Sequence, residues 1–404
     1  MLFELAWKNL WRNKLRSLII MTAIALGLLG GFTASALSFG MGEQMVETVI
    51  RTRVSHLQIT HPRFREDPDI QYYIPDAASL VGRLDSMPQV AAAAPRVLVN
   101  AMASSPQTAL GVELMGVIPQ RERELTIVDQ SIVEGTFFTR EEGESEAVIG
   151  QELAERLDLK AGSRVVFTFQ NAEGTITGGA FRVAGIFRTP STEFDLNTVF
   201  VQAQALAELL ETELQYQQVS VLFTSLEALD TSLSTVASVA SQMRVQTWNQ
   251  LAPELSFISE TLDVSLYIFM VVILLALAFG IVNTMLMVVL ERRRELGMLM
   301  AVGMKRKTLF LLIVLETLAL SLTGAVAGMV LTSIAVRILS VTGIDLSIIS
   351  EGLSEFGLTD VLYPLLPWTM YPILGVMVVV IAVLSAIYPA RRALKLKPAE
   401  ALRT

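Results

Sequence analysis

Four long apolar segments, almost free of charged residues, dominate the hydropathy pattern of this chain. They cover residues 17–40, 264–290, 308–339 and 371–390. Each is long enough to cross about 30 Å of hydrocarbon as a helix that rises about 1.5 Å per residue. Four such runs in one chain are improbable as buried core helices, so the pattern predicts four transmembrane helices.

A short amphipathic segment precedes the first span. Residues 1–16 combine Trp7, Trp11 and several leucines with four basic residues, a pattern typical of a helix lying among lipid headgroups. A cleaved signal peptide is the alternative, but the following apolar run is too long for one and lacks a clear cleavage motif.

Between the first two spans, residues 41–263 have the alternating pattern of a folded α/β domain. Strand-like runs occupy 56–60, 108–118, 164–169, 181–187, 198–201 and 218–223, and helical periodicity occupies 77–87, 150–157, 204–210 and 226–243. This alternation favours an α+β or α/β fold over a barrel. An inserted outer lobe is expected at about 119–184, and residues 40–53 either continue the first helix or form a hinge at Gly40 and Gly42.

Basic residues are concentrated on three short segments. Of the 31 Lys and Arg residues, 15 lie in residues 1–16, 291–307 and 391–404, which alternate topology places on one side of the membrane. The positive-inside rule makes these segments cytoplasmic, with both termini inside. Residues 41–261 hold 15 basic and 29 acidic residues, and all the charged residues of the loop 340–370 are acidic. Both segments are therefore expected on the non-cytoplasmic side of the membrane.

Composition agrees with a mixed membrane and aqueous architecture: 52% of residues are hydrophobic, 17% are charged, and the mean hydropathy is +0.53. With no cysteine and two histidines, a thiolate nucleophile, a thiolate metal site and a His-based metal site or triad are all disfavoured. There is no phosphate-binding G-x-x-x-x-G-K-[ST] motif and no nucleophile elbow. The sequence therefore predicts a non-catalytic protein without a cofactor or metal of its own.

Two polar residues inside the spans are candidate functional positions. Glu316 lies in the third span about two turns from its cytoplasmic end, where Lys307, Arg306 or a neighbouring chain is the expected partner. Asn283 in the second span is expected to hydrogen-bond to another helix rather than to a ligand. Two pairs of glycines are spaced four residues apart: Gly27 with Gly31, and Gly324 with Gly328. Such pairs let another helix approach closely, so a dimer through these helices is expected.

The charged segment 291–307 (ERRRELGMLMAVGMKRK) separates the second and third spans. Its sequence places Leu296, Met298, Leu299, Met300 and Val302 between two clusters of basic residues. This arrangement predicts a short amphipathic helix along the membrane surface, where a soluble partner could push on it.

The chain resembles the permease subunits of the MacB/LolC/LolE/FtsX superfamily of ABC transporters. The motifs that carry the resemblance are ERRRELGMLMAVGMKRKTLFLLIVLE, the C-terminal YPARRALKLKPAEALR and the opening AWKNLWRNKLRS. It implies a MacB-like periplasmic domain on an inner-membrane protein and a dimer of separate cytoplasmic ATPase subunits, which bind ATP and Mg. It also implies that the segment 291–307 is the ATPase-coupling helix, with Arg292, Arg293, Glu295, Leu296, Gly297, Met298, Gly303 and Lys305 in or beside the ATPase groove.

Length and domain order look most like the lipoprotein-releasing LolC/LolE type. That resemblance implies lateral entry of a lipid-anchored substrate between the first two spans, near Phe32, Leu37, Phe39, Met41, Met45, Leu262, Leu266 and Met270. These residues are equally compatible with ordinary lipid-facing surface. The hairpin 169–181 lacks the proline and arginine of the LolC hook, which argues against recruitment of a periplasmic chaperone.

Three functional hypotheses follow. The first is a permease that moves lipoproteins or another amphiphile from the inner membrane together with a second permease copy or paralogue and surrounding lipids. The second is MacB-like efflux of peptides or small molecules through a periplasmic adaptor. The third is a transmembrane regulator of a periplasmic hydrolase. No feature points to nucleic acid.

Overall fold

A computed structural model describes residues 2–12, 14–138, 145–349, 352 and 358–395. The chain divides into two compact units. The helical unit comprises Met1–Gly42, Ile258–Asp345 and Val361–Thr404, and the sheet unit comprises Glu43–Phe257 and Leu346–Asp360. The predicted cytoplasmic tail 391–404 lies outside the described residues beyond residue 395.

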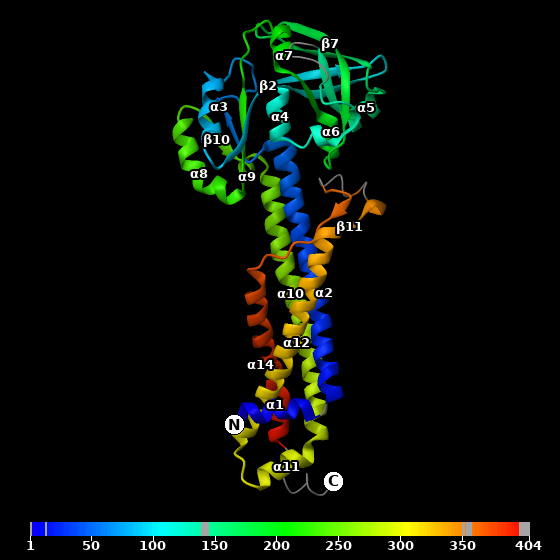
Figure 1. The fold of residues 1–404 in the computed structure, drawn as a ribbon, viewed down its shortest axis with the longest axis vertical. Coiled ribbons are helices and arrows are strands. Elements are labelled where there is room, and N and C mark those ends of the chain that lie inside the picture. The colour runs from blue at the N-terminus through cyan, green and yellow to red at the C-terminus, as the bar shows by residue number, and fades with distance from the viewer. Residues whose placement is uncertain (1, 13, 139–144, 350–351, 353–357, 396–404) are drawn as a thin grey trace. The chain divides into compact units, whose positions relative to one another are not determined.

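The helices of the helical unit follow the apolar runs (Figure 1). They are α1 (Leu2–Arg12), α2 (Lys14–Val49), α10 (Pro253–Glu291), α11 (Arg293–Ala301), α12 (Arg306–Thr342) and α14 (Met370–Leu394). Of these, α2, α10, α12 and α14 are long and apolar enough to cross a membrane. The predicted fold class is confirmed. α2 is helical to Val49 and then passes into the π-helical turn Ile50–Val54, so residues 40–53 continue the first helix.

Glycines let the helices of this unit approach closely. A Cβ on Gly328 would lie 3.0 Å from the Cα of Ala25 on α2, and one on Gly31 would lie 2.9 Å from the Ile273 side chain on α10. Gly324 and Gly27 make comparable approaches to α2 and α10. Both glycine pairs therefore serve packing within the chain, which corrects the interpretation that they lead to a dimer.

The segment after α12 returns along α2. Strands β11 (Ile344–Asp345) and β12 (Val361–Leu362) pair antiparallel. The Leu365 amide then donates to the Ala36 carbonyl at 2.9 Å. A Cβ on Gly40 would lie 2.3 Å from the Tyr363 carbonyl oxygen, so this position requires glycine.

The sheet unit is built on one ten-stranded sheet in the order β10-β1-β9-β2-β3-β8-β5-β7-β4, with β6 pairing with β2 and β7. Its strands are β1 (Leu57–Thr60), β2 (Val90–Ser104), β3 (Ala109–Val117), β4 (Ile132–Gly135), β5 (Glu146–Gly150), β6 (Arg164–Gln170), β7 (Ile176–Phe187), β8 (Thr198–Gln202), β9 (Gln218–Phe223) and β10 (Arg244–Thr247). Its helices are α3 (Ala77–Asp85), α4 (Pro119–Leu125), α5 (Gln151–Leu157), α6 (Thr192–Asn197), α7 (Ala203–Leu209), α8 (Leu226–Val239) and α9 (Trp248–Leu251), with 3-10 turns at Asp129–Ser131 and Ser347–Ile349.

Six strands close on themselves: β2 pairs with β3, β3 with β8, β8 with β5, β5 with β7, β7 with β6, and β6 with β2. Alternate side chains point inward, as on β6, where Val165, Phe167 and Phe169 are buried and their neighbours are exposed. The sequence pattern favoured an α+β or α/β fold over a barrel; the mixed α/β character is confirmed, and within it these six strands form a closed ring. The closing contact joins strands that are about 60 residues apart, which local periodicity does not register.

The second lobe of the sheet unit has its own core between β1, β9 and the first part of β2 on one side and α3 and α8 on the other (Figure 1). The lobes do not divide at 119–184, since β3 and β8 lie outside that range yet belong to the closed ring. β2 belongs to both lobes: it pairs with β9 up to Arg96 and with β3 from Arg96 onward.

Three consecutive charged residues of helix α4 make contacts where β2 passes from one lobe to the other. Glu122 binds Arg96 with two hydrogen bonds of 2.6 and 3.2 Å, and both side chains are fully buried. Arg121 pairs with Asp85 at the end of α3, and Arg123 donates to the Phe137 carbonyl in the ring lobe. The helix therefore links both lobes through the strand that they share.

Candidate coupling site around helix α11

Helix α11 is set off from its neighbours by two local breaks in the chain. Arg292 leaves the helical conformation with φ −89° and ψ 16°, which ends α10 and lets α11 start in a new direction. At the other end Gly303 adopts φ +103°, a left-handed conformation that favours glycine. Lys305 is extended and precedes α12.

The C-terminus of α11 has the hydrogen bonding of a Schellman motif. The Met304 amide donates to the Leu299 carbonyl at 2.9 Å, and the Gly303 amide donates to the Met300 carbonyl at 3.2 Å. These bonds satisfy the last carbonyls of the helix and reverse the chain. Gly303 is thus required by the turn itself.

The apolar residues of α11 and the turn that follows it fall on two different faces. Leu296 is buried in the core of the helical unit, and Gly297 beside it is buried as well. Met298 is half exposed, and Val302 is 88% exposed. The exposed basic residues Arg294, Lys305, Arg306 and Lys307 flank these two side chains. The segment therefore presents a small apolar patch with a basic surround.

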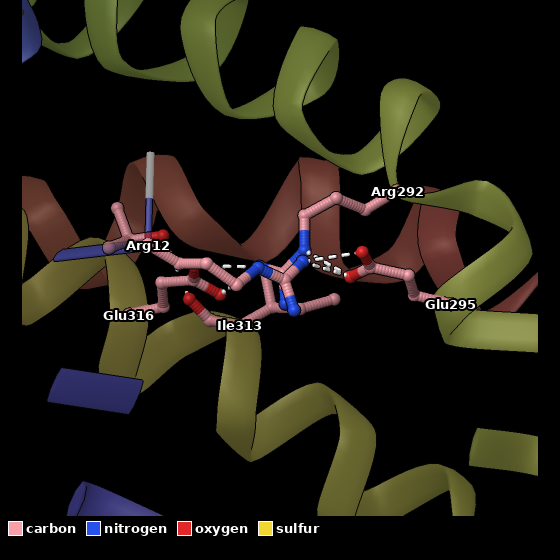
Figure 2. A network of polar contacts seen from close by, with 6 residues as sticks. Arg12, Arg292, Glu295, Ile313 and Glu316 are labelled. Carbon is pink, nitrogen blue, oxygen red and sulfur yellow. Dashed lines mark hydrogen bonds and ion pairs between the residues drawn. The ribbon is translucent and has the colours of Figure 1, made fainter. Parts of the chain in front are cut away.

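An ion network fixes the inner side of this segment (Figure 2). Arg292 donates through Nη1 to both carboxylate oxygens of Glu316 at 2.8 and 3.1 Å and through Nε to Glu295 at 3.0 Å. Glu295 also accepts from Arg12 of α1. The four charged side chains join α1, α11 and α12.

Burial makes the inner pair of this network the stronger one. The side chains of Arg292 and Glu316 are 12% and 8% exposed, whereas those of Arg12 and Glu295 are 50% and 40% exposed. Removing one partner of a buried pair leaves an uncompensated charge, whereas an exposed pair contributes little. The hydrogen bond from Arg12 nevertheless lowers the pKa of the Glu295 carboxyl, so Glu295 stays ionised.

The network differs from the sequence-based expectation for Glu316. Its partner is Arg292, not Lys307 or Arg306, because the break after α10 points Arg292 back toward α12. Sequence reasoning also missed Arg12, which lies 283 positions from Glu295. The only sequence signal for it was its position in a basic amphipathic helix.

The predicted coupling residues are close together but not equivalent. Arg292, Glu295, Leu296 and Gly297 hold α11 to the other helices, Arg293 is half-buried, and Met298, Gly303 and Lys305 are exposed. Met298 and Lys305 are therefore the predicted residues that are available to a partner.

Four of the eight residues proposed to meet a substrate are buried within the chain. Phe32 and Met270 pack in the core of the helical unit, and Leu266 and Met45 are buried. Leu37, Phe39 and Met41 are half-buried, and the side chain of Leu262 lies outside the described part of the chain. The buried members are not presented to a substrate in this arrangement, because the helical face chosen from sequence is the one that packs inside the chain.

Comparison with known families gives two adjoining matches. The MacB-like periplasmic core domain matches residues 17–245, more than half of the chain, and the FtsX-like permease C-terminal domain matches residues 267–398.

The chain belongs to the MacB/LolC/LolE/FtsX family of ABC transporter permeases.

Three relatives illustrate the range of this permease family. The chain is 23% identical over 393 residues to the lipoprotein-releasing system transmembrane protein LolE of Haemophilus influenzae, covering 94% of this chain and 92% of the relative. It is 22% identical to LolC of Xylella fastidiosa, covering 78% of each. It is 24% identical to the pyoverdine export ATP-binding/permease protein PvdT of Pseudomonas fluorescens, covering 86% of this chain and 54% of that protein.

Proposed function

We propose that this permease converts the ATP-driven motion of a separate ATPase subunit into movement of its membrane helices and of its sheet unit. The observation that carries the proposal is the exposed patch of Met298 and Val302 on a segment whose inner side is tied by ions to α1 and α12. A rigid, externally apolar element of this kind suits a soluble partner that pushes on it.

The ion pairs of this network can transmit a displacement of α11 to two other helices. Through Arg292 and Glu316 it acts on α12 directly, and through Glu295 and Arg12 it acts on α1, which precedes α2. A buried, charge-assisted pair resists separation more than an exposed one. The route to α12 is therefore the stiffer of the two.

In this proposal ATP and Mg are bound by the partner ATPase, and the chain itself holds no cofactor. We propose that both termini and α11 lie in the cytoplasm and the sheet unit in the periplasm of an inner-membrane protein, and the support is the concentration of basic residues on segments 1–16, 291–307 and 391–404. Two permease copies, or one copy and a paralogue, complete the complex.

For the substrate, we propose a lipoprotein or another amphiphile that is moved out of the inner membrane. The support is the similarity over nearly the whole chain to a protein of a lipoprotein-releasing system. Export of a small molecule is the second candidate, since the similarity to a pyoverdine exporter covers 86% of this chain. Residues 169–181 around the β6–β7 turn form a plain hairpin, so recruitment of a chaperone there is not part of the proposal.

The docking surface is tested with Met298→Asp and Val302→Asp in the full chain, co-expressed with its ATPase and purified in mild detergent. Both residues are exposed, so the fold should tolerate the change while the apolar contact is lost. A matched control is Val341→Asp, which is 73% exposed near the other end of α12. We expect loss of the ATPase with the first two variants and retention with the control. Retention in all three would refute docking at α11.

The substrate is tested separately by mass spectrometry of the intact complex. A co-purifying acylated protein would support lipoprotein transport. A co-purifying small molecule or peptide, together with a periplasmic adaptor and without acylated protein, would favour export instead.

A further inference from the structure

One edge of strand β2 is left unpaired in the middle of the strand. β9 pairs with this edge up to Arg96, and β6 pairs with it from Met102 to Ser104. The opposite edge of β2 pairs with β3 without interruption from Arg96 to Ser104. The wall of the ring therefore has an opening along β2 between Arg96 and Met102, which we call the edge gap.

Backbone groups of β2 point into the edge gap. The Arg96 carbonyl accepts from the Gln217 amide at 3.1 Å, and the Leu98 amide donates to Oε1 of Gln217 at 3.2 Å. Successive residues of a strand direct their backbone groups to alternate edges, so the N–H and C=O of Asn100 face the same side. Neither group pairs there with a strand that the structure describes. The edge gap is thus an incomplete β-ladder.

A cavity of about 550 Å³ lies against this part of β2. Leu98, Met102 and Ile176 supply apolar surface to it. The side chains of Met102 and Ile176 are 52% and 72% exposed. Among the described residues that line the cavity, Asp69 is the only charged one. The edge gap therefore combines free backbone groups, apolar contacts and one carboxylate.

We infer that the edge gap binds a short extended stretch of a polypeptide that this permease transports. An extended chain supplies backbone N–H and C=O groups at the spacing that an open strand edge requires. Its side chains can cover Met102 and Ile176, and a lysine or arginine among them can pair with Asp69. A ligand without a peptide backbone would leave the ladder incomplete. The inference rests on the proposed function, because it makes the transported substrate a polypeptide.

Backbone pairing is tested with the full chain and its ATPase in mild detergent. The probe is a fluorescein-labelled heptapeptide, SVSKSVS, whose binding is followed by anisotropy. Two further peptides carry N-methyl groups on alternate residues, each blocking one edge of the extended peptide and keeping all side chains. We expect one of them to bind about tenfold more weakly or worse and the other to bind like the parent, since a strand pairs with β2 through one edge. Equal binding of all three peptides, or no binding of the parent, would overturn the inference.

Two variants locate the bound peptide. Met102→Arg removes apolar surface and places a cation beside the lysine of the probe, and its matched control is Val133→Arg on β4, where the native side chain is 58% exposed. We expect binding to weaken about fivefold or more in Met102→Arg and to stay unchanged in the control. Equal loss in both variants would contradict binding at the edge gap.

The second variant, Asp69→Asn, keeps the oxygen that accepts from the Gln71 amide at 3.0 Å. It should abolish a preference of about two- to fivefold for the lysine probe over the same peptide with glutamine. An unchanged preference would exclude Asp69 from the site.

ATP hydrolysis distinguishes a transported polypeptide from a bound partner protein. The parent peptide should stimulate hydrolysis by the complex, and the methylated peptide that fails to bind should not. Binding without stimulation would mean that the edge gap takes a partner protein, which would overturn the inference. Co-purification of an acylated protein together with no peptide binding would overturn this inference alone. Absence of any co-purifying polypeptide would instead overturn the proposed substrate, whatever the peptide does.

Discussion

Replacing Glu122 by glutamine removes the negative charge that pairs with the Arg96 guanidinium while keeping the shape of the side chain. Both residues are fully buried, and Nη1 of Arg96 already has no hydrogen-bond partner among the described residues. Glu113 is near enough to act on Arg96, yet burial raises the pKa of Glu113 and limits its value as a replacement. The variant therefore leaves a buried charge without compensation.

The expected cost follows from this burial. Removing one partner of a buried ion pair costs about 3–5 kcal/mol. For a unit of this size each kcal/mol lowers the melting temperature by about 2–4 °C, so a fall of roughly 6–20 °C is expected. The surface pair of Arg121 and Asp85 is the matched control, with side chains 38% and 39% exposed. Asp85→Asn should cost less than about 1 kcal/mol.

A cysteine placed in the ring provides the assay, since the chain has no other. Ala103 is fully buried on β2, so Ala103→Cys should react with a maleimide only when the ring lobe opens. The temperature of half-maximal labelling is compared among the reporter alone, reporter with Glu122→Gln and reporter with Asp85→Asn. The double change Arg96→Met with Glu122→Leu should restore much of the stability, because it removes both charges.

Equal labelling temperatures for Glu122→Gln and Asp85→Asn would contradict this expectation. That outcome would mean that the buried guanidinium is neutralised or solvated elsewhere and that α4 does not fasten the two lobes.

Four further outcomes are expected. Arg292→Gln should reduce the stimulation of the partner ATPase by substrate more than it reduces co-purification of that ATPase. The substitution removes the ion pair between Arg292 and Glu316 but leaves the exposed patch of Met298 and Val302 unchanged. Burial lowers the pKa of His56 to about 4, so its stabilising effect is complete above about pH 6.5 and is lost as the pH falls toward 4. In His56→Gln the melting temperature should therefore fall less over this pH range. Burial raises the pKa of Asp195 to about 7, so its stabilising effect declines as the pH rises from about 4 through 7, and Asp195→Asn should remove this decline. Gly328→Val should destabilise the detergent-solubilised chain by about 1–3 kcal/mol, whereas Gly30→Val should be tolerated, since only the first Cβ would meet α2.

Within the sheet unit, the sequence predicted strands where β-branched and aromatic residues alternate with polar ones. β6 and β9 are examples, and their bounds agree with the predicted runs to within a residue. β2 was missed because its sequence is rich in alanine and contains Pro95, both unfavourable for a strand in isolation. Pairing with β9, β3 and β6 overrides that local preference.

At the candidate site, the sequence located the segment but not its contacts. The length of the segment, its basic residues and its amphipathic pattern were sufficient to predict α11. Which face is buried depends on the break at Arg292, and the partner of Glu316 depends on where that break directs the guanidinium. Neither property is encoded in a window of neighbouring residues.

Hydropathy and periodicity are local properties of the chain, so they were sufficient to predict the four spans, the α/β character of the large domain and the place of α11. Three features became visible only in the folded chain: six strands form a closed ring, Arg12 and Arg292 connect α11 to α1 and α12, and Asn283 is exposed. These features join residues that are far apart in the chain, and their energies arise from burial and charge pairing that exist only after the chain has folded.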